Sequence, residues 1–176
     1  MGMDCELKNK VWVIAGGECS GKTTLFESLQ PALPQYQFVS EYNRIWLEER
    51  GGTAPFAFVV LDTLFQDCLI HYQNIDVSIP TILDTDLLNL FLWAKSIEHP
   101  SVVALHEEWS KTQFNYLLCS PDIPYVSDPL RSGWEIRKWS WEQHLHFTKQ
   151  RHHFVLKSND AASRLLEAKE IILSAE

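Results

Sequence analysis

One short segment near the amino terminus has the residue types and spacing of a phosphate-binding loop. Residues 16–23 read GGECSGKT and fit the pattern G-x-x-x-x-G-K-[ST] at every fixed position. Glycines let successive backbone N–H groups point at phosphates, and Lys22 supplies a flexible charge for the β- and γ-phosphates. The Thr23 hydroxyl is placed to bind Mg²⁺, and Thr24 can reach an α-phosphate. The segment predicts binding of a nucleoside triphosphate with Mg²⁺. We expect the phosphates to contact Gly17, Glu18, Cys19, Ser20, Gly21, Lys22, Thr23 and Thr24.

Acidic residues at the ends of two apolar runs could complete a phosphoryl-transfer site. In residues 82–86 (ILDTD), Asp84 stands where apolar residues give way to acid, and we assign it to the Mg²⁺ shell, with a helix N-cap as the alternative. Asp86 is a candidate ligand for a substrate hydroxyl, although it or Thr85 could be that cap. Glu41 ends another run, and we expect it to act as a base or to orient the acceptor hydroxyl. The alternative for Glu41 is a solvated helix start.

Positive charges for the transferring phosphoryl group are expected from two places. Arg44 follows Glu41 by about one helical turn and could clamp a phosphate or pair with Glu41. The segment 121–139 is a long loop in our interpretation, and a loop with arginines can close over a triphosphate and stabilise charge in the transition state. Its charged residues include Asp128, Arg131, Arg137 and Lys138. We choose Arg131 for this role, and the alternative is an ordinary surface loop.

Aromatic and histidine side chains give weaker signals. Seven tryptophans favour an aromatic-lined pocket, although core packing is the alternative for each of them. Tyr42, Trp46 or Trp93 could stack on a pyridine or a nucleobase alike. The seven histidines lack the spacing of a metal site, so we expect them on the surface or in the core.

Strand-like and helix-like patterns alternate along the whole chain. Short apolar runs predict strands at residues 10–15, 37–40, 81–84, 115–119 and 153–156. Helices are predicted at residues 21–30, 42–50, 55–72, 87–95, 102–111, 142–151 and 160–173, the first stopped by Pro31 and Pro34 and the last capped by Asn159 or Asp160. This alternation predicts an α/β fold with a five-stranded parallel sheet and helices on both faces. Ligands of such folds lie at the carboxyl ends of the strands.

Composition limits the classes of partner. The 176 residues predict a single domain over 1–176, and the net charge of −8 with no Lys/Arg-rich block argues against nucleic acid. We expect a small-molecule partner. No apolar run is long enough to span a membrane, and the first ten residues lack the apolar region of a signal peptide. Four cysteines without metal-ligand spacing favour a reducing cytoplasm. The sequence carries no indication of oligomeric state.

Four segments together resemble one family of kinases. They are residues 16–25 (GGECSGKTTL), 41–44 (EYNR), 82–87 (ILDTDL) and 122–131 (DIPYVSDPLR). The chain resembles the nicotinamide riboside kinase domain of bifunctional regulators of NAD biosynthesis, a group of AAA-like P-loop kinases. The four segments occur in the order and at the spacing typical of that family, and they span nearly the whole chain. The segment 122–131 corresponds to the lid of that family, and it differs in one position, because Pro129 stands where family lids often have glycine.

This resemblance implies an adenylate-kinase-like fold with a lid at about 121–139. It implies ATP as donor and transfer of the γ-phosphoryl group to the 5′-hydroxyl of a nucleoside, nicotinamide riboside first, to give the mononucleotide. The expected catalytic residues are Lys22, Glu41, Asp84 and Arg131, with Arg131 also on the nucleotide. The acceptor is expected to contact Glu41, Tyr42, Arg44, Asp86, Trp93 and Asp128. A kinase of another metabolite, or a regulatory protein that binds or hydrolyses ATP without an acceptor, remains the alternative.

Overall fold

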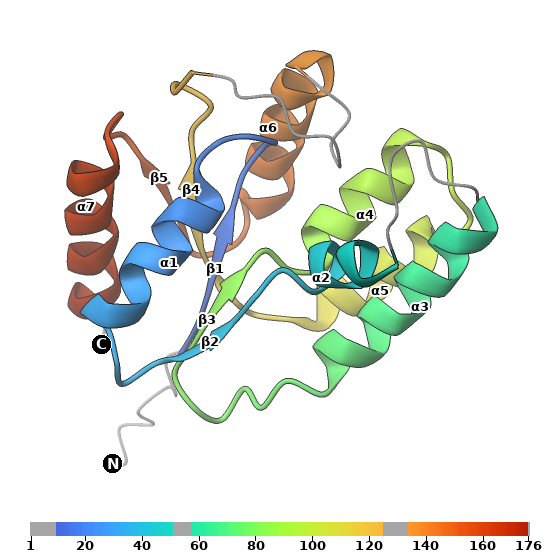
Figure 1. The fold of residues 1–176 in the computed structure, drawn as a ribbon, viewed down its shortest axis with the longest axis horizontal. Coiled ribbons are helices and arrows are strands. Elements are labelled where there is room, and N and C mark those ends of the chain that lie inside the picture. The colour runs from blue at the N-terminus through green and yellow to red at the C-terminus, as the bar shows by residue number, and fades with distance from the viewer. Residues whose placement is uncertain (1–9, 51–57, 125–133, 176) are drawn as a thin grey trace, which may run out of the picture.

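A five-stranded parallel sheet forms the centre of the molecule (Figure 1). The computed structural model describes residues 10–50, 58–124 and 134–175. The strands are β1 (Val11–Ala15), β2 (Gln37–Val39), β3 (Thr81–Asp84), β4 (Asn115–Cys119) and β5 (His153–Leu156), and their order in the sheet is β2-β3-β1-β4-β5. The three central strands are buried along their full length. Their near-continuous apolar runs follow from this burial on both faces.

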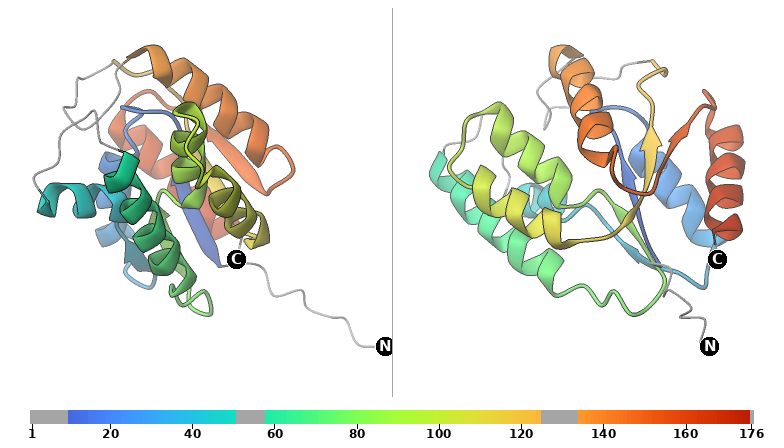
Figure 2. Two further views of the ribbon diagram at one scale, coloured as in Figure 1. Left: turned by 90° about the vertical axis from the view of Figure 1, so that its right-hand side faces the viewer. Right: turned by 180° about the vertical axis from the view of Figure 1, so that it is seen from behind.

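Helices cover both faces of this sheet (Figures 1 and 2). One face carries α1 (Lys22–Ala32) and α7 (Ala161–Ser174), which pack beside each other. The other face carries α2 (Tyr42–Glu49), α3 (Phe58–Gln73), α4 (Leu87–Ser96), α5 (Val102–Lys111) and α6 (Trp134–Thr148). Side chains of β1 alternate between two cores, with Val11 and Val13 on the second face and Trp12 and Ile14 on the first. The predicted fold class is therefore confirmed.

The largest difference from the sequence-based expectation lies in α6. We expected a loop over 121–139 and a helix over 142–151, but the helix begins at Trp134 and ends at Thr148. Its buried positions are Arg137, Ser140, His144 and Thr148, which recur at helical spacing. Because this buried stripe is polar, a search for hydrophobic periodicity does not find it.

Pro31 was expected to stop α1 at residue 30, and this prediction is wrong. The helix continues to Ala32 with Pro31 inside its last turn. Beyond that turn, the Leu33 N–H donates to the Leu29 carbonyl at 2.9 Å, and both leucine side chains are buried. Packing of these leucines in the core therefore compensates for the loss of the backbone hydrogen bond that proline cannot make.

The last helix begins at a cap that the sequence indicated. The Asp160 carboxylate accepts a hydrogen bond from the Ser163 N–H at 2.9 Å, so Asp160 rather than Asn159 is the N-cap. In the ranges 10–50, 58–124 and 134–175, no helix combines the length and apolar character that crossing a bilayer requires.

Candidate active site

The phosphate-binding loop lies at the topological switch point of the sheet. It follows β1, which lies between β3 and β4 in the centre of the sheet. Gly16 has a φ of 142°, and a Cβ atom built on it would lie 2.5 Å from the carbonyl oxygen of Cys119. A Cβ on Gly17 would lie 2.8 Å from the Arg137 carbonyl oxygen. Glycine is therefore required at both positions, and the loop sits where α/β proteins bind their ligands.

Lys22 places its ammonium group inside this loop. The side chain is 4% exposed, and its Nζ donates to the carbonyls of Gly16 at 3.2 Å and Gly17 at 2.9 Å. The Ser20 hydroxyl also donates to the Gly17 carbonyl, at 2.8 Å. A phosphate would offer Lys22 charged acceptors in place of these neutral ones, and charge-assisted hydrogen bonds are about twice as strong.

Thr23 and Asp84 meet across the carboxyl edge of the sheet. The Thr23 hydroxyl at the start of α1 donates to Oδ2 of Asp84 at 3.0 Å, and Asp84 is buried at the end of β3. Hydroxyl and carboxylate oxygens suit Mg²⁺, which is usually held by one or two protein groups together with substrate phosphates and water. No group of three His, Cys, Asp or Glu side chains that could hold a metal occurs among the described residues. The pair therefore fits a metal that is shared with a bound nucleotide.

A strained residue separates the two aspartates that follow β3. Thr85 has a φ of 66°, which is unfavourable for a β-branched residue and is typical of functional sites. Asp84 faces Thr23 in the layer of α1, whereas the Asp86 carboxylate accepts from the Leu88 N–H at 3.1 Å and from the Tyr116 hydroxyl at 2.6 Å. Asp86 is thus the N-cap of α4, one of the alternatives that the sequence left open. The structure does not turn its carboxylate towards the phosphate-binding loop.

Glu41 lies at the same edge of the sheet as Asp84. It follows β2, which pairs with β3, and it is the N-cap residue of α2. Its side chain is only 7% exposed, and Oε1 accepts a hydrogen bond from Nδ2 of Asn43 at 3.3 Å. A buried carboxylate at this edge is not the solvated helix start that we considered as the alternative. The sequence analysis did not single out Asn43, which holds this carboxylate by a hydrogen bond.

Three other expected acceptor residues, Tyr42, Trp93 and Arg44, contact neighbouring side chains of the chain itself. Tyr42 stacks on His71, with ring centroids 4.2 Å apart and an interplanar angle of 7°. Trp93 makes an edge-to-face contact with Phe65. Arg44 pairs with Glu48 through Nε at 3.0 Å on an exposed part of α2.

Trp46, another aromatic residue that could have stacked on the acceptor, lies in the core. Trp46 is buried and donates from its indole nitrogen to Asp67, so it serves the core rather than a ligand. Asp128 and Arg131 lie outside the described residues, as does Pro129, so these expectations stay predictions.

Comparison with known proteins supports the interpretation of the loop and the sheet. A family model described as an AAA domain matches residues 11–164. The chain belongs to this AAA domain family. No curated protein sequence matches the chain. Solved structures do match it, and they show that this AAA domain has the fold of P-loop kinases.

Three of these structures show how far the similarity extends. NadR protein in complex with NR is 18% identical with a TM-score of 0.67, over 96% of this chain and 52% of that one. NadR in complex with NAD and AMP-PNP is 16% identical with a TM-score of 0.71, over 96% and 49%. Thymidylate kinase from Ehrlichia chaffeensis is 11% identical with a TM-score of 0.67, over 92% and 97%. The AAA domain described here thus spans about half the length of the NadR chains, and the family resemblance seen in the sequence is confirmed in the fold.

Two buried arginines hold the phosphate-binding loop of this AAA domain from outside. Arg137 in α6 donates through Nη2 to the carbonyls of Cys19 at 3.3 Å, Pro121 at 2.7 Å and Ile123 at 2.8 Å. Arg164 in α7 donates through Nη1 to the Ser20 carbonyl at 2.7 Å. Carbonyls that are held outwards leave the N–H groups of the loop free to point inwards at phosphates. The sequence analysis did not assign this role, because only the folded chain brings α6 and α7 to the loop.

Replacing Arg164 by methionine should weaken nucleotide binding. Arg164 also donates through Nε to the carbonyl of Ser158, between β5 and α7, at 3.0 Å, so the variant removes a donor from this carbonyl and from that of Ser20 in the loop. Hydrogen bonds to charged groups contribute about 1.5–3 kcal/mol each, so we expect the dissociation constant of Mg·ADP to rise about 10-fold or more. Isothermal titration calorimetry measures this change.

The matched control for this prediction is Arg151→Met. Arg151 also donates to backbone carbonyls, those of Thr112 and Ser110, but at the opposite end of the sheet. Its loss should lower the stability of the fold and leave the affinity for Mg·ADP unchanged. Equal effects of both substitutions on nucleotide affinity would show that Arg164 acts through general stability alone.

His144 is a buried neutral histidine on the face of α6 that packs near the loop. Its Nδ1 lies 2.8 Å from the Ser140 carbonyl and must carry the proton, while no described residue bonds to its Nε2. Burial, with the positive charge of Lys22 as a smaller cause, lowers the pKa of His144 to about 4. The native state therefore resists protonation of this ring.

This histidine should make the fold sensitive to acid. The pKa of His144 is lower in the folded chain than in the unfolded chain, so its contribution is fully present above about pH 6.5 and is lost as the pH falls towards 4. When the pH is lowered from 7.5 to 5.0, we expect the unfavourable protonation of buried His144 to reduce the free energy of unfolding by about 2 kcal/mol. Urea unfolding of His144→Asn measures this effect. The difference between its free energies of unfolding at pH 7.5 and pH 5.0 should be about 2 kcal/mol smaller than the difference for the wild type. An unchanged pH dependence would contradict the assignment.

Buried polar atoms without partners mark the same edge of the sheet. Among the described residues, the hydroxyls of Thr85 and Ser120 and Nη2 of Arg164 have no hydrogen-bond partner. Thr85 and Ser120 directly follow β3 and β4, and Arg164 contacts the phosphate-binding loop. Buried polar groups are nearly always paired, so these atoms indicate a site built to receive a polar ligand.

Proposed function

We propose that this chain is an ATP-dependent kinase that phosphorylates the 5′-hydroxyl of a ribonucleoside. Nicotinamide riboside is the first candidate for the acceptor, and its mononucleotide is the product. One observation carries the proposal: the Thr23–Asp84 hydrogen bond of 3.0 Å beside the buried Lys22, with the buried Glu41 after the neighbouring strand. This arrangement combines a phosphate cradle, two metal-binding oxygens and a carboxylate at one edge of the sheet.

Each side chain has a defined role in this reaction. Lys22 neutralises charge on the β- and γ-phosphates, and the loop N–H groups orient them. Mg²⁺ would be held by Thr23 and Asp84, and it would supply charge neutralisation on the phosphate oxygens. Glu41 orients the acceptor hydroxyl and takes its proton. A bond then forms between that oxygen and the γ-phosphorus, the bond from the γ-phosphorus to the bridging oxygen breaks, and ADP leaves.

The aromatic residues proposed to contact the acceptor lie on α2 and α4. Tyr42 and Trp93 offer aromatic surface to a ring, and a cationic pyridinium would gain cation–π attraction. Arg131 and Asp128 are proposed to act from the segment that follows residue 124. The structures of NadR in complex with NR, 18% identical to this chain, and with NAD and AMP-PNP, 16% identical, support the choice of nicotinamide riboside.

The release of ADP separates a kinase from an ATP-hydrolysing protein. With Mg·ATP alone, we expect slow release, because a kinase site excludes water from the reacting phosphate. Adding nicotinamide riboside, or another nucleoside from a panel, should raise the rate severalfold in a coupled ADP assay. A rate that no acceptor changes would favour the regulatory alternative over the kinase.

A further inference from the structure

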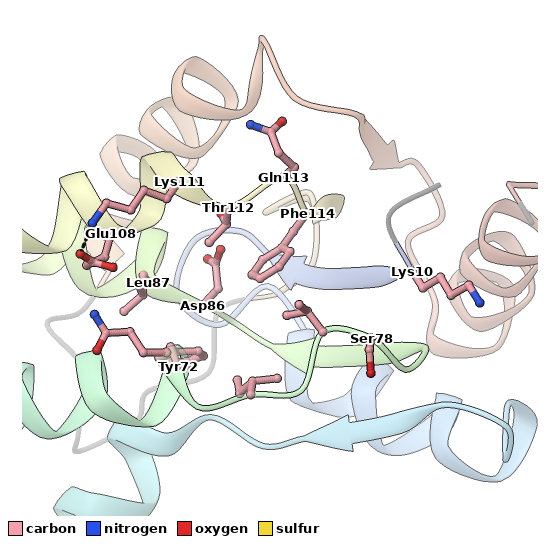
Figure 3. A pocket seen from close by; sticks show the side chains of 13 residues that line it. Lys10, Tyr72, Ser78, Asp86, Leu87, Glu108, Lys111, Thr112, Gln113 and Phe114 are labelled. Carbon is pink, nitrogen blue, oxygen red and sulfur yellow. Dashed lines mark hydrogen bonds and ion pairs between the residues drawn. The ribbon is translucent and has the colours of Figure 1, made fainter. Parts of the chain in front are cut away.

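A cavity lies beside Asp86, on the side of the Thr85 turn that faces away from Asp84 and the phosphate-binding loop. It has a volume of about 670 Å³ and runs between α3 and α5 (Figure 3). At the amino-terminal edge of the sheet it is bounded by Lys10 and Ser78. Most of its wall is apolar, formed by Tyr72, Ile75, Val77, Leu87 and Phe114. A cavity of this size and character is typical of a site for a small molecule.

The inner part of this cavity contains the carboxylate of Asp86. Figure 3 shows this side chain pointing towards Thr112 and Phe114, with Tyr72 on the other side. Two hydrogen bonds reach the carboxylate, from the Leu88 N–H and the Tyr116 hydroxyl. An ionised carboxylate can accept about four hydrogen bonds, so capacity remains for a donor on a ligand. A negative group in an apolar wall attracts a donor, and a positively charged donor most strongly.

The surroundings of Asp86 hold its carboxylate in place. The Tyr116 hydroxyl that donates to it accepts in turn from the indole N–H of Trp109 at 2.7 Å. Tyr116 is fully buried, and Trp109 is nearly so. A carboxylate fixed by two buried aromatic side chains loses little conformational entropy when it binds a ligand, which favours binding.

This cavity is separate from the site of the proposed kinase reaction. Its lining includes no residue of the phosphate-binding loop, and Asp84 and Asp86 face opposite layers of the fold. The cavity reaches the amino-terminal edge of the sheet at Lys10, whereas the loop follows the carboxyl end of β1. A ligand could therefore occupy it while a nucleotide occupies the loop.

We propose that this cavity binds a small aromatic molecule that carries a cationic or N–H donor group. The ring packs between Tyr72 and Phe114, and the donor meets Asp86. Lys111 at the rim is paired with Glu108, so its charge is offset there. This site does not depend on the proposed kinase activity, and either idea can fail without the other.

Benzamidine is a suitable probe because it joins an aromatic ring to a cationic donor. Titration calorimetry on the full chain should show saturable binding with a dissociation constant of about 1 mM, as expected for a ligand of so few atoms. Benzoate, which has the same shape and the opposite charge, should not bind. Absence of benzamidine binding, or equal binding of benzoate, would overturn the proposal.

Two matched tryptophan variants locate the binding. Val77→Trp fills the cavity at an exposed position, and Val103→Trp makes the same change at a position on α5, 62% exposed, that does not line it. We expect the first to weaken benzamidine binding at least 10-fold and the second to leave it unchanged. Both should keep the affinity for Mg·ADP. Unchanged benzamidine binding in Val77→Trp would place the ligand elsewhere and contradict the proposal.

A third variant tests the contribution of the carboxylate. Asp86→Asn retains a capping oxygen for α4 but removes the charge, so benzamidine should bind about 10-fold more weakly while the neutral analogue benzamide keeps its affinity. A general loss of packing would weaken both ligands equally, and that result would contradict direct contact with Asp86.

Discussion

Replacing Lys22 by alanine should reduce kcat/KM for Mg·ATP by about 10²–10³-fold, the scale for loss of one preorganised charged donor. Lys22 is the cation inside the phosphate-binding loop, and its ammonium already lies on the carbonyls of Gly16 and Gly17. The variant loses the charge that would neutralise the β- and γ-phosphates and also releases those two carbonyls. Steady-state kinetics together with titration of Mg·ADP should show both effects.

Lys138→Ala is the control for this substitution. Lys138 lies on α6 next to Arg137, but its side chain is 82% exposed and contacts Glu142 at 3.9 Å only weakly. Exposed ion pairs contribute little, so activity and nucleotide affinity should stay at the wild-type level. Wild-type nucleotide affinity in Lys22→Ala would contradict the assignment of residues 16–23 to phosphate binding.

Replacing Glu41 by glutamine should lower kcat by roughly 10²-fold or more and leave the affinity for ATP unchanged. The amide has nearly the same shape and can still contact Asn43, but it cannot take a proton from the acceptor hydroxyl. Because Glu41 is the N-cap residue of α2 and does not belong to the phosphate-binding loop, the loss should appear in kcat rather than in nucleotide binding.

Glu49→Gln makes the same change on the same helix at a position that is exposed. Glu49 forms an ion pair of 3.7 Å with Arg50 on the surface, so its variant should be as active as the wild type. If Glu41→Gln turned over as fast as Glu49→Gln, Glu41 would be neither the base nor the orienting group, and another carboxylate would have to fill that role.

Regular patterns in the sequence predicted the sheet and the position of the loop at residues 16–23. The strands at 81–84, 115–119 and 153–156 were predicted with the bounds that the structure shows, because short apolar runs bounded by turn residues are typical of strands. The segment 16–23 predicted a loop between a strand and a helix, and the structure contains it. Thr23 and Asp84 were both assigned to Mg²⁺, and the structure brings their side chains into hydrogen-bond contact.

Features that depend on tertiary packing could not be predicted in this way. The helical face of Arg137, Ser140, His144 and Thr148 is polar and buried, which reverses the usual relation between burial and hydrophobicity. The opposite orientations of Asp84 and Asp86 arise from the positive φ of Thr85, although residues two apart in a strand normally face the same side. Strain at a functional site violates local rules, so it is found only in the folded structure.

The most direct test of the account is to identify the product formed from Mg·ATP and a nucleoside. The wild-type chain is incubated with nicotinamide riboside and with a panel of other nucleosides, and the products are analysed by mass spectrometry. We predict a nucleoside heavier by one phosphoryl group, formed in equal amount with ADP and lost in Lys22→Ala. If no nucleoside of the panel is phosphorylated while the chain binds Mg·ATP, the kinase assignment is contradicted.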